Sequence, residues 1–391
     1  MSEIKVNSIK GVAASSAAIT ISNTDGTCTA NITNNLSNRN LIINGAMQVA
    51  VRATSGSTAD GFPSLDRFYT FSNGLDENPT MSQGSLTSSD TPFSSGFRKY
   101  LRFQNGNQTS GAGASDQTYF RQGIEAQNVA QSGWNYTSSS SFITLSFWIR
   151  ASVAQTYYGF LKAPDGSNYL YPFSMALSAN TWTKVTKSIA GNSNLTFDND
   201  TGLGLEVGIY AYLGTSFTDN SVSLNAWAAY SSGATRTPDH TTTWYTTNDS
   251  TIDITGVQLE VGSVATDFEH RSIAVEKRLC MRYFQKYVNI GATGFVPDNT
   301  SKSYAHVFHF PVEFRATPTA TATNTGSVAG QYIGDGDNTV TISSLSSSAH
   351  TTQICEMYFN LSSDLTNFRG AYPSSSDSSS RQTTFSFTAE L

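Results

Sequence analysis

The stretch Thr251-Ile-Asp-Ile-Thr-Gly-Val-Gln-Leu-Glu-Val-Gly262 decides how the chain is divided. Its apolar residues lie first on even and then on odd positions: Ile252, Ile254, Val257, Leu259 and Val261. Side chains of a strand alternate between two faces, so this change would turn the apolar face away from the core unless one extra residue is accommodated. Gly256 stands at the change, and we therefore predict a β-bulge there.

A helix is predicted directly after this strand, over Ser272–Phe284. Ser272 is a suitable N-cap, and Glu276 suits the positive end of the helix dipole in the first turn. The apolar stripe expected to be buried is Ile273, Leu279, Cys280, Tyr283 and Phe284, and the basic residues expected to face away are Lys277, Arg278 and Arg282. This helix would join two parts of the chain that both show strand patterns.

The strand patterns predict an all-β fold with two antiparallel β-sandwiches. Residues 41–270 hold short strands at about ten-residue spacing, with turn residues between them, which is typical of a sandwich. The clearest is Leu203–Leu213, in which every second residue is apolar. Residues 271–391 hold the linker helix and a distal sandwich, whose last strand includes Phe385 and Phe387.

Residues 1–40 form a third segment, which has no large aromatic side chain. Such a segment cannot bury enough apolar surface to offset the entropy of ordering it. We expect it to be ordered by packing on copies of itself or on another protein, as an attachment or oligomerisation segment. A frayed terminus is the alternative.

Composition and charge narrow the class of function. Only 13% of the 391 residues are charged, while Ser, Thr, Asn and Gly are abundant, as on an extracellular or virion surface. The net charge is −6 and no Lys/Arg run occurs, which argues against binding nucleic acid through its phosphates. No apolar run is long enough to cross a bilayer and no signal-peptide pattern is present, so we expect no membrane insertion and synthesis in a cytoplasm. The three cysteines are expected to be packed free thiols.

Metal and cofactor sites are not expected. His306 and His309 lie three apart on a strand and so point to opposite faces. The acidic stretches Gly334–Asn338, Phe197–Asp200 and Thr218–Asn220 favour tight turns, and a structural Ca²⁺ at a sandwich edge stays open as an alternative.

No catalytic set stands out either, and we expect no enzyme. The Gly-x-Ser-x-Gly and His-Glu-x-x-His motifs are absent from the sequence. Glu260, Asp267 and Glu269 cluster near the predicted bulge, where His270 and Arg271 favour salt bridges and turn hydrogen bonds. A pair of carboxylates from distant strands, as in a glycosidase, stays open.

An aromatic loop is the candidate ligand site. Sugars stack their C–H faces on Trp and Tyr, while Asn and Asp bind hydroxyls. The residues of this type between positions 214 and 250 are Trp227, Tyr230, Trp244, Tyr245, Asn248 and Asp249. Trp227 and Tyr230 could equally be packing residues.

Eight stretches together resemble tail-fibre proteins of tailed bacteriophages, those of marine bacteria and cyanobacteria above all. They are Asn40–Met47, Leu65–Phe68, Gln122–Glu125, Leu224–Tyr230, Ile254–Gly262, Phe268–Arg271, Leu279–Phe284 and Phe385–Leu391. Their order and spacing carry the resemblance, which covers nearly the whole chain. It implies a central sandwich like a carbohydrate-binding module, a homotrimer, and residues 1–40 bound to a tail nozzle, adaptor or baseplate protein. It transfers no receptor site.

We therefore expect a receptor-binding tail fibre in the virion that contacts host-surface glycans through its β-sandwiches. Two alternatives remain: a surface-polysaccharide depolymerase, and a passive adaptor or collar fibre that binds no receptor.

Overall fold

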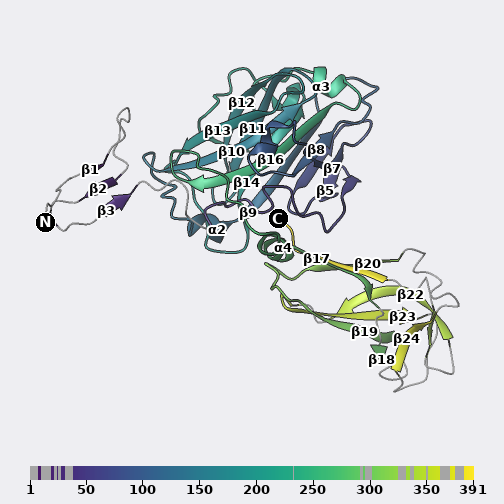
Figure 1. Cartoon of the computed structure of the whole chain (residues 1–391). Coiled ribbons are helices and arrows are strands. Elements are labelled where there is room, and N and C mark those ends of the chain that lie inside the picture. The colour runs from purple at the N-terminus through teal and green to yellow at the C-terminus, as the bar shows by residue number, and fades with distance from the viewer. Residues whose placement is uncertain are drawn as a thin grey trace.

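A computed structural model describes residues 8–9, 19–21, 24, 28–30, 38–231, 233–290, 294–295, 302–324, 332–334, 339–348, 351–361, 370–374 and 383–391. Antiparallel strands dominate, and short helices lie between some of them (Figure 1). The all-β class predicted from the alternation is confirmed. The domain limits at 40/41 and 270/271 stay predictions.

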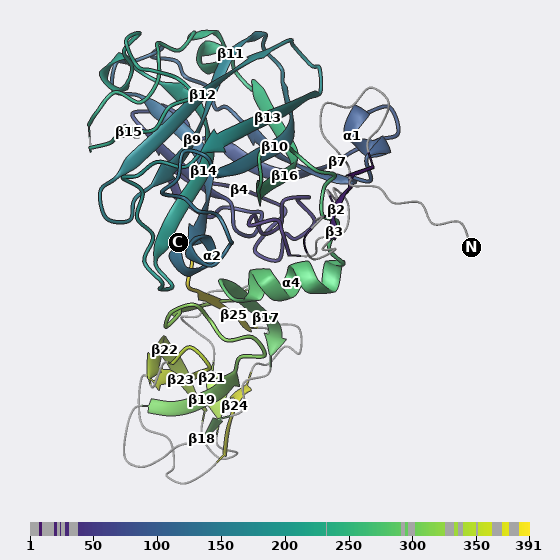
Figure 2. The ribbon, with the colours of Figure 1, turned by 90° about the vertical axis from the view of Figure 1, so that its left-hand side faces the viewer.

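The central part is a sandwich of two sheets (Figure 2). The order of the six-stranded sheet is β13 (Thr183–Ala190), β10 (Phe142–Ala151), β16 (Thr251–Val261), β8 (Lys99–Gln104), β7 (Thr80–Ser85) and β4 (Ser55–Ser57). The order of the seven-stranded sheet is β15 (Ala228–Ala229), β12 (Tyr169–Leu177), β11 (Gln155–Ala163), β14 (Leu203–Leu213), β9 (Gln117–Glu125), β6 (Tyr69–Asn73) and β5 (Asp60–Gly61). The connections contain α1 (Thr91–Ser94), α2 (Ala126–Ala130), η1 (Thr215–Phe217) and α3 (Thr243–Thr246).

The core lies between these two sheets and follows the alternation of the strands. Alternate residues of β10, from Ile143 to Ile149, face alternate residues of β14, from Leu205 to Ala211, in one buried cluster. Each fully buried aliphatic or aromatic side chain contributes about 1.5–3 kcal/mol relative to exposure. Because this core holds the two sheets together, the side chains on their outward faces are not needed for that packing.

The β-bulge predicted at Gly256 is confirmed. Ser146 pairs with Gln258 and Trp148 with Thr255, so a single residue of β10 faces two residues of β16. Gly256 has φ +65°, which glycine adopts without strain. The extra residue keeps the apolar side chains directed to the core on both sides of it.

The neighbour of β16 changes at the bulge. β8 pairs with Thr251–Ile254 only, and beyond the bulge residues 40–45 take its place. The Leu41 amide donates to the Leu259 carbonyl at 2.9 Å, and the Val257 amide donates to the Gly45 carbonyl at 2.9 Å. The sheet therefore divides at this point, and the segment leading from the N-terminal strands fills one side of the division.

Helix α4 (Ile273–Met281) follows as predicted, with Ser272 as its N-cap: the Ser272 hydroxyl accepts from the Val275 amide at 3.4 Å. Cys280, Tyr283 and Phe284 are buried as expected. Two details of the predicted stripe are wrong. Ile273 is 48% exposed, because the buried face of the helix begins only at Glu276. Arg282 does not face away, because it pairs with the buried Glu125.

The C-terminal part is also antiparallel. A three-stranded sheet holds β17 (Phe284–Ile290), β25 (Thr383–Thr388) and β20 (Thr319–Asn324). Beside it, a closed barrel runs through β18 (Gly294–Phe295), β19 (Lys302–His309), β23 (Ile354–Leu361), β22 (Thr339–Ser348), β21 (Tyr332–Gly334) and β24 (Gly370–Ser374). In this part the Phe308 ring packs against the rings of Phe385 and Phe387, and the Phe310 ring packs against that of Phe387. The ring centroids lie 4.9 Å apart in each of these three pairs.

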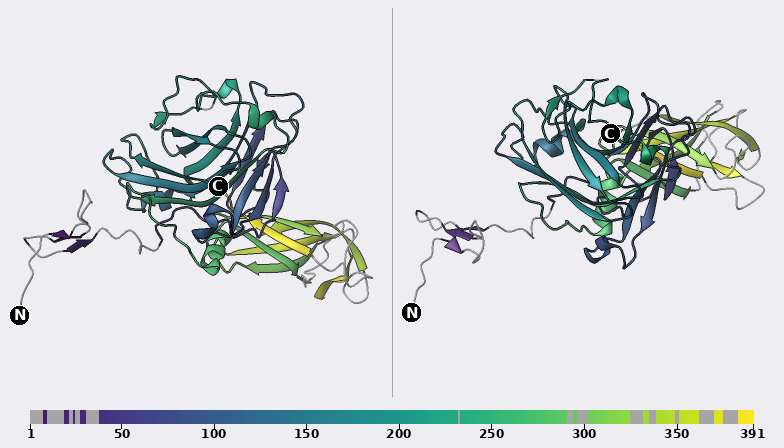
Figure 3. Two further views of the ribbon diagram at one scale, coloured as in Figure 1. Left: turned by 45° about the horizontal axis from the view of Figure 1, so that its top comes forward. Right: turned by 90° about the horizontal axis from the view of Figure 1, so that it is seen from above.

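Near the other end of the chain, β1 (Ser8–Ile9), β2 (Ile19–Ile21) and β3 (Cys28–Ala30) form a small sheet. Figure 3 shows this sheet apart from the central sandwich. Within the described ranges, no helix is long and apolar enough to cross a membrane.

A buried ionic junction joins the central sandwich to the C-terminal part. The Glu125 carboxylate, at the end of β9, accepts from Arg282 Nε at 2.7 Å, from Arg282 Nη2 at 2.8 Å and from the Tyr283 hydroxyl at 2.6 Å. Nearby, Arg67 pairs with Glu390 and lies over the Tyr283 ring, 3.4 Å from its centroid. Both parts of the chain therefore contribute to one desolvated network.

Candidate functional site

Trp244 and Tyr245, the main candidates for glycan contact, are core residues, and their prediction is corrected. The Trp244 side chain is fully buried and lies parallel to the Phe103 ring at 6.3 Å. Tyr245 stacks on Tyr212 at 4.1 Å and donates its hydroxyl to Asp116 at 2.9 Å. Helix α3 turns both rings into the sandwich, so neither presents a face to solvent.

The other four candidates do not form one site with them. The Trp227 indole donates to the Ala190 carbonyl at 2.9 Å, and its half-buried ring packs on Tyr171. Tyr230 is half-buried, with the Lys162 ammonium 5.3 Å from its ring centroid. Asn248 and Asp249 are exposed after α3, and Asp249 accepts from Gln104 at 2.6 Å. The expected aromatic loop is thus mostly a packing element.

Glu260 and Glu269, beside the bulge, have the structural role expected of them, whereas the exposed Asp267 carboxylate makes no such contact with the described residues. Glu260 accepts from the Thr266 amide at 2.8 Å and pairs with Arg39 at 3.4 Å. Glu269 accepts from the Asn40 amide at 2.8 Å and pairs with Arg271 at 3.3 Å. These contacts fasten the loop after β16 to residues 38–40.

No group of three or more potential metal ligands occurs among the described residues. In the Phe197–Asp200 stretch, Asp200 accepts from the Gly202 amide at 2.8 Å, which is a turn contact. In the Thr218–Asn220 stretch, both ends bind the Asp239 carboxylate. The His306 side chain and the acidic residues of Gly334–Asn338 lie outside the described part of the chain.

The most developed surface feature is an aromatic row across the outward face of the seven-stranded sheet. Strand pairing places one ring on each of four strands, in register: Phe71 on β6, Tyr119 on β9, Tyr210 on β14 and Tyr158 on β11. Phe71 stacks on Tyr119 at 5.3 Å, and Tyr119 meets Tyr210 edge-on at 5.6 Å. The first three rings are therefore in direct contact, and Tyr158 stands in register beside Tyr210 on the next strand.

A charged row runs beside the aromatic one. Glu206 is buried and pairs with Arg121 at 3.2 Å and with Lys162 at 3.3 Å. The Arg121 guanidinium also lies 4.1 Å from the Tyr69 ring centroid. Arg121 Nη1 also donates to the Leu391 carbonyl at 3.4 Å, and an arginine held by a carboxylate, a ring and a carbonyl has little freedom.

One half of this sheet face is covered and the other is open. Over Tyr158 and Tyr210, the connection of residues 214–240 packs its own apolar side chains, those of Phe217, Leu224 and Tyr230. The other half carries the half-buried side chains of Phe62, Tyr69, Phe71, Tyr119 and Arg121, which we call the aromatic platform. Partly exposed rings that are held in place by packing are suited to stacking with a ligand.

The hydroxyls of the platform are hydrogen-bond donors at neutral pH. Burial raises the pKa of Tyr119 to about 12, with Glu206 adding to the effect. Burial, together with a hydrogen bond to Asp60, also raises the pKa of Tyr69. Both phenols therefore stay protonated, and the surface combines apolar rings with neutral hydroxyls and one guanidinium.

The strand patterns missed the platform, although a signal was present. Tyr119 and Phe120 are adjacent on β9, so the two rings must lie on opposite faces of the sheet. Phe120 and Ile124 share the core face, which leaves Tyr119 and Arg121 facing outward. Parity within each strand could have separated the outward rings from the core rings.

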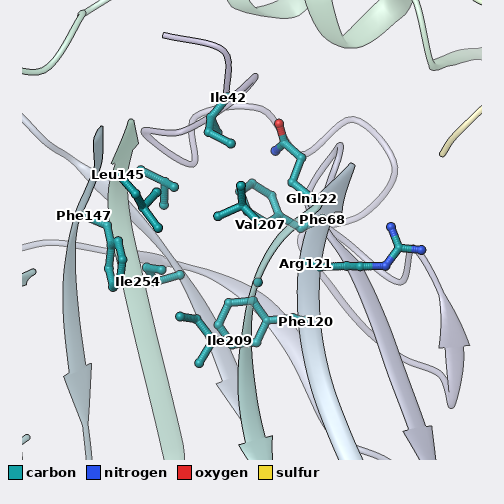
Figure 4. A pocket seen from close by; sticks show the side chains of 12 residues that line it. Ile42, Phe68, Phe120, Arg121, Gln122, Leu145, Phe147, Val207, Ile209 and Ile254 are labelled. Atoms are coloured by element: carbon teal, nitrogen blue, oxygen red, sulfur yellow. The ribbon is translucent and has the colours of Figure 1, made fainter. Parts of the chain in front are cut away.

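An internal cavity of about 20 Å³ lies behind the platform, between the two sheets. Figure 4 shows Ile42, Val207 and Ile209 directed into it, while the Arg121 guanidinium points away from it. Its lining is almost wholly apolar and its volume suits one water molecule at most, so it is a packing space and not a ligand site.

No protein-family model matches the chain, and no curated protein matches its sequence. Among solved structures, a putative sugar binding protein from Bacteroides thetaiotaomicron is 12% identical, with 57% of this chain and 100% of that chain covered and a TM-score of 0.31. The N-terminal cellulose-binding domain of β-1,4-glucanase C from Cellulomonas fimi is 12% identical (55% and 97% covered, TM-score 0.27). A cyclase from Fischerella sp. TAU is 10% identical (59% and 98% covered, TM-score 0.31). All three TM-scores lie below 0.5, so these likenesses carry no argument about function.

Proposed function

We propose that this chain is a structural, non-catalytic tail-fibre component of a phage virion, and that its central sandwich binds host-surface glycan through the aromatic platform. The observation that carries the binding proposal is the open half of the seven-stranded sheet. There, Tyr69, Phe71 and Tyr119 are only partly buried, whereas a neighbouring connection covers the buried Tyr158 and Tyr210 on the rest of the sheet face.

The chemistry of the platform suits a polysaccharide chain. Pyranose rings present flat C–H faces that stack on aromatic rings, and their hydroxyls need a few fixed donors and acceptors. Arg121 and the Tyr119 hydroxyl supply donors, and Asp60, which already accepts from the Tyr69 hydroxyl, supplies acceptor oxygens at the rim. Several rings in a strip favour a ligand of several sugar units over a single one.

The virion part of the proposal rests on the order and spacing of the stretches that resemble tail-fibre proteins. In this arrangement the chain is a homotrimer, residues 1–40 dock on a tail nozzle, adaptor or baseplate protein, and the sandwich is free to meet the host. The small sheet of β1–β3 is compatible with an attachment segment that packs on partners.

Binding of the full-length protein to purified host-envelope polysaccharide tests the platform. Tyr119→Ala should weaken binding by about thirtyfold, which corresponds to the roughly 2 kcal/mol of a single aromatic hot spot. Trp227→Ala, which removes a ring outside the platform, is the control and should bind like the wild type once its folding is verified. Equal affinities for wild type and Tyr119→Ala would remove the platform from the proposal.

Two measurements separate the fibre from its alternatives. A stable monomer by native mass measurement would overturn the trimer. Release of reducing ends from the same polysaccharide would identify a depolymerase, whereas purified protein that fails to adsorb to host cells would leave the passive adaptor fibre.

A further inference from the structure

A second pocket opens on the opposite side of the sandwich, on the outward face of the six-stranded sheet. Its volume is about 350 Å³, and it lies beside the bulge at Gly256. Its walls come from the segment 94–97, β10, β13, β16 and the loop after β16, and combine aromatic and polar side chains, among them Ser146, Trp148, Lys184, Asp267, Phe268 and His270. It shares no residue with the aromatic platform.

The pocket exists because the sheet divides at the bulge. β8 leaves β16 at the Leu101–Ile254 pair, and the segment that replaces it, residues 40–45, does not fill the space near the start of β8. Gly256 contributes no side chain there, and a Cβ atom on it would come within 2.6 Å of the Phe97 ring. The bulge and the pocket are therefore one feature of the backbone.

The loop after β16, residues 266–270, forms one wall of the pocket and is fixed in place by its contacts. His270 Nε2 lies 3.0 Å from the Ser95 carbonyl oxygen, and the Phe268 ring meets the Phe97 ring edge-on at 4.9 Å. The charged contacts of Glu260 and Glu269 described above hold the same loop at its base. A pocket with such a fixed wall is largely pre-formed, as ligand sites usually are.

Three polar groups around the pocket are available to form hydrogen bonds with a ligand. Among the described residues, the Trp148 indole N–H, the Lys184 ammonium and the Asp267 carboxylate have no hydrogen-bond or ionic partner. Trp148 is half-buried, while Lys184 and Asp267 are exposed. A ligand could therefore stack on the Trp148 ring while it exchanges hydrogen bonds with a donor and an acceptor at the rim.

Charge and size select the class of ligand. One ammonium and one carboxylate balance each other at neutral pH, so the pocket attracts neither anions nor cations strongly. Its volume lies near the lower end of the range of about 300–1,000 Å³ for small-molecule sites. We propose that this pocket is a second carbohydrate site, which takes one or two neutral sugar rings independently of the platform.

Titration of the full-length protein with small neutral sugars tests the proposal. The probes are the methyl glycosides of glucose, galactose and mannose, and N-acetylglucosamine, each followed by saturation-transfer NMR and calorimetry up to about 10 mM. At least one should bind, and Trp148→Ala should weaken it by about tenfold or more. Lys184→Ala, an exposed change that cannot disturb the core, should weaken it several-fold.

Three comparisons make the outcome decisive. Lys277→Ala, which removes a matched exposed lysine on α4, should leave sugar binding unchanged, and so should the platform variant Tyr119→Ala. Absence of binding by the wild type, or equal affinities for the wild type and Lys184→Ala, would overturn the second site. Glucuronate that binds tenfold more tightly than the neutral sugars would overturn the assignment of an uncharged ligand. Loss of binding in Tyr119→Ala alone would place the bound sugar on the platform and reject this pocket.

Discussion

The ionic junction at Glu125 should control the stability of the whole chain. Glu125 is fully buried, and its carboxylate receives two hydrogen bonds from Arg282, one from Tyr283 and one from the Gln127 side-chain amide at 2.6 Å. Arg282 retains 29% side-chain exposure. The two single substitutions therefore leave different groups behind, and their costs should differ in a predictable order.

Arg282→Ala should be the more damaging change, because it leaves a carboxylate buried without its counter-charge. Removal of one partner of a buried pair costs about 3–5 kcal/mol, and the full burial of Glu125 places this variant in that range. Glu125→Ala leaves an arginine that can turn toward solvent, so we expect about 2 kcal/mol, the cost of the lost charged hydrogen bonds. The double variant should cost less than the sum of the two.

Urea unfolding of the two single variants and the double variant, as a double-mutant cycle, measures these free energies. The coupling should also depend on pH. Burial raises the pKa of Glu125, but the hydrogen bonds from Arg282 and Tyr283 outweigh it, and the net pKa lies below its usual value. A depressed carboxyl pKa stabilises the fold above the unfolded pKa and loses this effect as the pH falls through the folded pKa. Additive costs at neutral pH, or a smaller cost for Arg282→Ala than for Glu125→Ala, would refute the reasoning.

Further predictions concern single residues. Gly256→Ala should cost about 1–3 kcal/mol more than Gly111→Ala in urea unfolding, because both positions have positive φ but only the first would clash, with Phe97. Equal costs would contradict the role given to that close approach. Burial raises the pKa of Asp66 to about 6, so its stabilising effect is fully present below the unfolded pKa of 3.8 and is lost as pH rises through 6. Asp66→Asn should therefore stabilise the protein at pH 8, by up to about 3 kcal/mol, and not at pH 4, and an unchanged pH profile in urea would show that this carboxyl does not titrate as described. Cys280 is buried and its thiol pKa is raised, so a thiol reagent should modify it only after unfolding, and rapid labelling of native protein at that residue would show that the α4 face opens.

Local chemistry made much of the fold predictable. In β16 the apolar residues pass from even to odd positions, so either a bulge is present or the apolar face turns away from the core. Glycine at this change favoured the bulge. The N-cap serine and the turn residues likewise act within a few positions of themselves. The C-terminal barrel was harder to predict from the sequence, because closure of a barrel depends on which strands pair, and alternation alone does not determine the pairing.

The candidate site was less predictable for a related reason. Trp244 and Tyr245 lie in a polar stretch, which suggested an exposed loop, yet helix α3 places both rings in the core. Composition reports how many aromatic residues a segment holds but not which way its backbone turns them. Strand parity does report direction, which is why Tyr119 could have been assigned to the outward face and Trp244 could not.

The contacts of residues 38–45 have a mechanical consequence. The Arg271 guanidinium donates to the carbonyls of Asn40 and Ile42, and the Glu276 carboxylate accepts from the Asn44 amide. The chain entering the sandwich is thus bonded directly to the first turn of the helix that leaves it. Tension applied between the N-terminal strands and the C-terminal part would pass through this short link and spare the two sheets, so the sandwich could hold its ligands while the chain is under load.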